Sequence, residues 1–81
     1  MQIRVIYFAV YAELLGKRQE AVTLEKETSV SDLFQRLTQG IQNQDSLFLH
    51  TVFAVNEDYV EPSHILQEGD EVVFIPPVSG G

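Results

Sequence analysis

The chain has 81 residues, 44% of them hydrophobic and 21% charged, which is the composition of one small folded domain. Twelve acidic against five basic residues give a formal net charge of −7, which disfavours nucleic acid as a ligand and favours solubility or a basic partner. There is no cysteine for disulfide or thiolate chemistry and no apolar run of about 20 residues, so we expect a cytoplasmic protein that begins at Met1 and does not bind membranes.

The first half of the sequence predicts two strands and a helix. Residues 2–10 are rich in β-branched and aromatic side chains, as in a central strand, and a short helical piece over residues 11–15 leads to a turn at residues 16–18. Residues 20–25 alternate apolar and polar, which predicts a strand with one buried face. Residues 29–37 carry apolar groups at helical spacing, with Ser29 as the N-cap and Gly40 as the left-handed C-terminal stop.

The second half predicts three further strands. Residues 41–50 have a weak pattern and are expected to form a second short helix or an irregular loop. Strands over residues 51–55 and 59–61 flank Asn56, Glu57 and Asp58, of which the Asn and Asp tolerate the backbone of a tight hairpin. A turn at residues 69–70 leads into a last strand over residues 71–75. Pro76 ends this strand because it has no N–H for the sheet ladder.

The order β-β-α-β-β-β predicts an α+β fold of the β-grasp type. We expect a mixed sheet of about five strands with one main helix packed on one face. Residues 1–75 would form the domain, and residues 76–81 a flexible C-terminal tail that ends in Gly-Gly.

One helix cannot cover both faces of such a sheet. In the first strand Ile6 and Phe8 point away from the face that bears Val5 and Tyr7, so apolar groups lie on both sides. We expect a partner patch that contains Phe8 and Ile75, with Val60 as a weaker member. The alternatives are a loop that covers this face, or scattered apolar residues without a function.

The tail carries the main candidate for chemistry. Its residues are Pro76, Pro77, Val78, Ser79, Gly80 and Gly81. Glycine has no Cβ, so the last two residues could enter a channel too narrow for a side chain, and the carboxylate of Gly81 is a candidate reaction site. The alternative is an ordinary frayed terminus.

Catalytic groups are not readable in the rest of the sequence. His50 and His64 have no partner at metal-ligand or general-base spacing, and no serine lies beside a base or an oxyanion motif. The acidic pairs Glu57-Asp58 and Asp70-Glu71 fall in predicted turns. We therefore expect no metal site and no catalytic residue, and we interpret the chain as a substrate or carrier for other enzymes.

Several segments together resemble the small subunits of molybdopterin synthases, sulfur-carrier proteins of the ubiquitin-like β-grasp superfamily. The matching segments are VIYFA at residues 5–9, AELLG at 12–16, AVN at 54–56, GDEV at 69–72 and FIPPVSGG at 74–81. The ending is the most specific of them. Ile75 departs from the family, which often has an aromatic residue there.

This resemblance implies a role in molybdenum cofactor biosynthesis. A partner activating enzyme would use ATP to adenylate Gly81, which would become a thiocarboxylate and donate sulfur to cyclic pyranopterin monophosphate in the large synthase subunit. The tail would insert into that subunit, in a heterotetramer, and the chain would bind no permanent cofactor. A carrier for another metabolite or for tRNA, a ubiquitin-like protein modifier, and a plain interaction module remain as alternatives.

Overall fold

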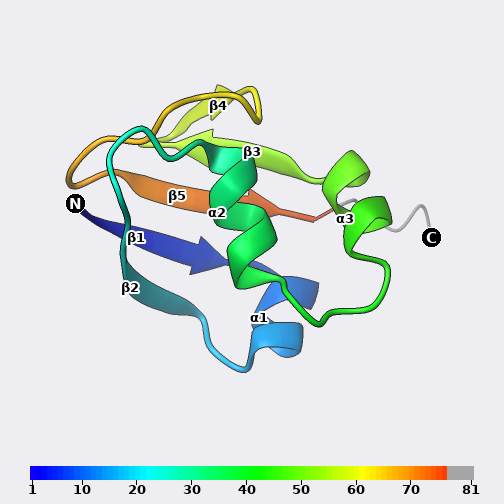
Figure 1. Cartoon of the computed structure of the whole chain (residues 1–81). Coiled ribbons are helices and arrows are strands. Elements are labelled where there is room, and N and C mark those ends of the chain that lie inside the picture. Colours follow the sequence, from blue (N-terminus) through cyan, green and yellow to red (C-terminus); the bar gives the residue numbers. More distant parts are fainter. Residues whose placement is uncertain (77–81) are drawn as a thin grey trace.

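The computed structural model describes residues 1–76 of the chain. In chain order its elements are β1 (Gln2–Tyr7), α1 (Val10–Leu15), β2 (Gln19–Thr23), α2 (Val30–Leu37), α3 (Gln44–His50), β3 (Val52–Val55), β4 (Asp58–Val60) and β5 (Glu71–Ile75). The strands form one five-stranded sheet, and α2 crosses one of its faces while α1 and α3 lie toward one end (Figure 1). This is the predicted β-grasp arrangement, with α2 as the main helix.

The sheet is mixed, and its centre joins the first strand of the chain to the last. The strand order is β2-β1-β5-β3-β4. β1 and β5 are parallel, with Val5 opposite Val72, whereas the three other strand pairs are antiparallel. β5 therefore has hydrogen-bonded neighbours on both sides, and it runs toward the end of the sheet where α3 lies (Figure 1).

Helix α2 begins and ends within the predicted segment, but Gly40 is not the residue that ends it. Ser29 Oγ accepts a hydrogen bond from the Asp32 backbone N–H (3.1 Å), and the Asp32 carboxylate accepts one from the Ser29 N–H (3.5 Å), which is a capping box. The C-cap is Thr38, whose hydroxyl donates to the Phe34 carbonyl (2.7 Å). Gly40 does have a left-handed backbone (φ 85°), but in the turn beyond the helix, so the expectation that it stops α2 was wrong.

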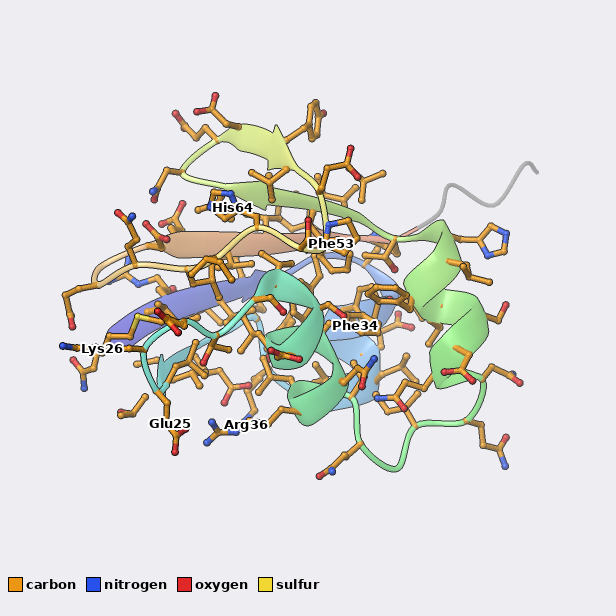
Figure 2. The ribbon with its side chains drawn as sticks, turned by 45° about the horizontal axis from the view of Figure 1, so that its top comes forward. Glu25, Lys26, Phe34, Arg36, Phe53 and His64 are labelled. Carbon is orange, nitrogen blue, oxygen red and sulfur yellow. The ribbon has the colours of Figure 1, made fainter. Side chains whose placement is uncertain are left out.

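An aromatic cluster fills the space between α2 and the sheet. Phe34 from α2 lies against Phe53 and Phe74 from the sheet, with ring centroids 5.6 and 5.3 Å apart. Figure 2 shows Phe34 and Phe53 directed toward each other between the two layers. Tyr11 of α1 completes the cluster, with its ring 5.8 Å from those of Phe34 and Phe74. All four side chains are buried, so α2, α1, β3 and β5 share one core.

Several element boundaries differ from the sequence-based expectations. β1 stops at Tyr7 rather than at residue 10, and the helical piece begins at Val10. The weak segment does contain a helix, α3, and β5 ends at Ile75 as predicted. Within residues 1–76 the longest helix has eight residues, and none is long and apolar enough to cross a membrane.

Candidate functional site

The sheet face opposite α2, called the open face below, carries apolar side chains from four strands. Strand registers place Ile6 beside Val73, Val73 beside Ala54, and Ala54 beside Tyr59. One step further along, Ile75 pairs with Val52. None of the helices within residues 1–76 covers this face (Figure 1). Ala54 is buried, but Ile6, Val73 and Ile75 are partly exposed and Val52 and Tyr59 are exposed. Apolar groups that gather on one face in this way are typical of an interaction site.

Phe8 and Ile75 are assigned to the open face from the residues that precede them. Tyr7 and Phe74 are register partners, and both are buried on the α2 side. Ile75 follows Phe74 within β5, so strand alternation directs it to the open face. Phe8 lies one residue beyond the end of β1, and we infer the same direction for it because Tyr7, immediately before it, faces α2. Phe8 is 50% exposed and Ile75 is partly exposed. The patch of Phe8 and Ile75 stays a prediction, with Ile75 placed on the open face and Phe8 exposed just beyond the end of β1.

Val60 lies on the opposite face, which corrects the expectation that it joins Phe8 and Ile75. Its register partner in β3 is Phe53, a buried residue of the core. Val60 itself is partly buried and packs against that core. The alternation along β4 instead directs Tyr59, which is 79% exposed, to the open face.

Sequence reasoning missed two exposed members of the open face, Val52 and Tyr59. Both belong to strands that the sequence predicts. They differ from the next residues in their strands only in the side of the sheet to which their side chains point. What the sequence does not show is which alternating set faces the helix. That choice is fixed by the pairing of β3 with β5 and β4, which are long-range contacts.

A charged pair marks the other end of the open face. Arg4 of β1 lies beside Glu71 of β5, and an Arg4 guanidinium nitrogen is 3.9 Å from a Glu71 carboxylate oxygen. Both side chains are well exposed, so this ion pair contributes little to stability. The face is therefore polar where β5 begins and apolar where β5 ends.

The tail begins at the apolar end of this face. Ile75 is the last residue of β5, and Pro76 is partly exposed. β5 pairs with β1 as far as Phe74 and with β3 as far as Ile75, so the sheet fixes the end of this strand. Pro77, Val78, Ser79, Gly80 and Gly81 lie outside the described residues. The apolar area thus adjoins the point from which the proposed reactive segment departs.

The acidic turns have structural partners. Asp70 is buried, and its carboxylate accepts hydrogen bonds from the Gln67 backbone N–H (2.7 Å) and from Asn56 Nδ2 (2.9 Å). Asn56 Oδ1 accepts from the Glu71 N–H (3.0 Å), which ties the β3–β4 hairpin to the start of β5. Asn56 and Glu57 supply the positive φ values of that hairpin. The Asp70 carboxylate thus holds the turn before β5 and links it to the β3–β4 hairpin.

Two buried tyrosines and His50 have hydrogen-bond partners within the fold. The Tyr7 hydroxyl donates to a Glu20 carboxylate oxygen; burial, then this bond and the Glu20 charge, raise the pKa of Tyr7. The Tyr11 and Thr51 hydroxyls are 2.6 Å apart, and burial raises the pKa of Tyr11. His50 Nδ1 lies 2.8 Å from the Ser46 carbonyl oxygen. Within residues 1–76, no three His, Cys, Asp or Glu side chains gather as a metal site.

Comparison with known proteins gives consistent matches along the chain. The model of the ThiS family matches residues 5–81. The molybdopterin synthase sulfur carrier subunit of Chlamydomonas reinhardtii is 39% identical, over 100% of both chains. The subunit of the same name from Homo sapiens is 35% identical, over 99% of this chain and 94% of the human one.

Two solved structures have the same fold. SAMP1 from Haloferax volcanii superposes with a TM-score of 0.81 over 100% of both chains, at 24% identity. A chain from the protein–protein complex of subunits 1 and 2 of molybdopterin-converting factor from Helicobacter pylori superposes with a TM-score of 0.64 over 100% of both chains, at 18% identity. The fold prediction is therefore confirmed.

Proposed function

We infer, from the premise that this chain belongs to the ThiS family, that it acts as a sulfur carrier subunit of molybdopterin synthase in molybdenum cofactor biosynthesis. Both relatives described above carry that name and match over nearly their whole length. A carrier subunit is non-catalytic, because the chemistry on its cargo is performed by the enzymes that load and unload it.

Gly81 is the residue that we propose to carry the sulfur. A carboxylate is a poor electrophile, so its oxygen would first attack the α-phosphorus of ATP on an activating enzyme and release pyrophosphate. Hydrosulfide (HS⁻) from the sulfur donor would then attack the carbonyl and displace AMP from the acyl adenylate, and loss of its proton would leave the thiocarboxylate. Gly80 and Gly81 suit these two reaction steps, because glycine presents no side chain to hinder attack on the carbonyl. ATP is used by the activating enzyme, and the carrier would need no permanent cofactor.

The observation that carries the proposal is the position of the apolar open face beside the start of the tail. Burial of about 300 Å² of apolar surface contributes on the order of 7 kcal/mol. Ordering the five residues after Pro76 in a groove costs roughly 1–2 kcal/mol each, which is a sum of similar size. Docking through Phe8, Ile75 and their neighbours would thus hold the tail in a partner and still allow release.

The same face would serve two partners in turn. The related Helicobacter pylori structure is a complex of subunits 1 and 2, which supports a large synthase subunit as one partner. We propose a heterotetramer of two large subunits with one carrier at each end, in which the Gly81 thiocarboxylate donates sulfur to cyclic pyranopterin monophosphate. The activating enzyme would be the second partner. Both steps would take place in the cytoplasm.

Intact-mass analysis of a reconstituted reaction tests this function. The chain is incubated with the activating enzyme, ATP and a sulfur donor, and then with the large subunit and cyclic pyranopterin monophosphate. We expect replacement of one oxygen by sulfur at Gly81, followed by dithiolene product and return of the carboxylate. The chain without Gly81 is the control and should not be loaded. A wild-type chain that remains a carboxylate would contradict the proposal, and Gly81 joined to lysine in cells would favour a protein modifier.

A further inference from the structure

The backbone at Ala9 has a conformation that alanine rarely adopts. Its φ is 48° and its ψ is −119°. The Tyr11 backbone N–H donates to the Phe8 carbonyl (3.0 Å), which closes a four-residue turn with Ala9 in its first central position. These angles resemble the roughly +60° and −120° of that position in a type II′ turn, where glycine is the preferred residue. Ala9 is therefore strained.

Two buried tyrosines hold the turn from either side. The Tyr7 side chain is buried, and its backbone N–H donates to the Arg18 carbonyl (2.9 Å). The Tyr11 side chain is buried against the aromatic cluster, with its hydroxyl 2.6 Å from that of Thr51. Only three residues connect these anchors, so the chain must turn sharply between β1 and α1. Helix α1 has no side-chain N-cap to guide this turn.

The strained residue directly follows the exposed aromatic ring of the open face. A non-glycine residue in such a conformation persists only where the surrounding structure fixes it, and such residues concentrate at functional sites. Glycine at this position would remove the strain. It would also admit many more backbone conformations, so the direction of Phe8 would no longer be fixed. Alanine at this position therefore keeps the turn strained but restricts the backbone, which fixes the direction of Phe8.

We propose that Ala9 is a positioning residue for docking: its strained turn holds Phe8 outward on the open face before a partner binds. The inference rests on the proposed function, since docking on the large synthase subunit is the step that Ala9 would assist. A ring that is already held in place loses less conformational freedom on binding. Ala9 would thus strengthen association through Phe8 without any contact of its own.

Ala9→Gly tests this role, because it should change affinity and stability differently. We expect the Kd for the large subunit to rise by roughly tenfold, which corresponds to about 1.4 kcal/mol and to the cost of ordering one residue. The Tm should not fall, since glycine relieves the strain at a positive φ. Glu27→Gly is the matched control. Glu27 also has a positive φ (65°), and it adjoins Lys26 at the end of the molecule away from α3 (Figure 2).

A double-mutant cycle with Phe8→Ala decides whether Ala9 acts through Phe8. In the Phe8→Ala background, Ala9→Gly should change the Kd by less than about twofold. An unchanged Kd for Ala9→Gly alone would overturn the proposal, as would equal effects in both backgrounds. A loss of affinity matched by a lower Tm would also overturn it, because the turn would then be merely structural.

A measurement on the isolated chain separates this inference from the proposed function. The backbone order parameter of Phe8 by NMR should fall from about 0.85 in the wild type toward 0.6 in Ala9→Gly. If the wild type fails to bind the large subunit, the proposed partner is wrong, and the NMR result still decides the effect of Ala9 on Phe8. An unchanged order parameter would overturn the positioning role.

Discussion

The ring of Phe34 in α2 packs on the ring of Phe74 in β5, with centroids 5.3 Å apart and planes inclined at 61°. Phe74 lies one residue before the end of the strand that leads into the tail. It also contacts the rings of Tyr7, Tyr11 and Phe53 at centroid distances of 5.5 to 5.8 Å. The main helix therefore fixes the point from which the tail departs.

Phe74→Ala should remove a large part of the stability of the domain. Loss of a fully buried phenylalanine costs about 3–5 kcal/mol, against a total of about 5–15 kcal/mol for a small domain. We expect a large fall in the urea midpoint, followed by circular dichroism. Phe48→Ala is a useful comparison, because Phe48 is only partly buried and contacts Phe34 and Phe53 from α3. A smaller loss for Phe74→Ala than for Phe48→Ala would contradict this view of the core.

Phe8→Arg should weaken docking without unfolding the chain. Half of the Phe8 side chain is already exposed, so arginine can reach water there, whereas a docked partner would bury the charge. We expect the Kd for the large subunit and for the activating enzyme to rise by at least about tenfold, measured by calorimetry. The Tm should change by less than about 4 °C.

Ile65→Arg is the control for this substitution. Ile65 has a similar exposure, 47%, but its backbone bridges to Ser29 at the start of α2. We expect both affinities to stay within about twofold of the wild type, because a surface change away from the docking face has little effect. Equal losses for the two variants would show that net charge, rather than the open face, governs association.

Val60→Asp should behave as a core substitution. Val60 packs against the core beside Phe53, so a carboxylate there would lose water without gaining a partner. We expect a loss of about 1–3 kcal/mol in the free energy of unfolding. Tyr59→Asp, on the exposed side of the same strand, should cost much less. If Val60→Asp instead leaves stability intact and abolishes docking, the assignment of faces in β4 is wrong.

Alkaline pH should destabilise the fold through Tyr7. Its folded pKa is raised by burial and by Glu20, so the folded state retains the phenol proton that the unfolded chain releases near pH 10. The stability that Tyr7 contributes in this way is fully present below pH 10 and is lost as the pH rises above 10. We expect the free energy of unfolding to fall more steeply between pH 9 and about pH 11 in the wild type than in Tyr7→Phe. Parallel curves would exclude Tyr7 as the cause.

Much of the fold follows from local patterns, and the errors lie where long-range contacts decide. The apolar spacing in α2 and the capping box at Ser29 are local, so the helix was predicted correctly at its start. Helix α3 was uncertain because its N-cap, Asn43, is left-handed and makes no side-chain cap bond. The turn at Ala9 was invisible because alanine is not a typical turn residue. Val60 was misplaced because strand register, which no local pattern specifies, selects its face.

The parallel pairing of β1 with β5 also bears on how the protein is made. The two strands at the centre of the sheet come from opposite ends of the chain, so the sheet closes only after residues 71–75 have been synthesised. A nascent chain that stops before β5 lacks Ile75 and the neighbour that completes the open face. Binding to the large subunit should therefore be undetectable for a free chain truncated after residue 70. The order of strands would ensure that partners recognise the carrier only when the proposed sulfur-carrying residue, Gly81, is about to be added.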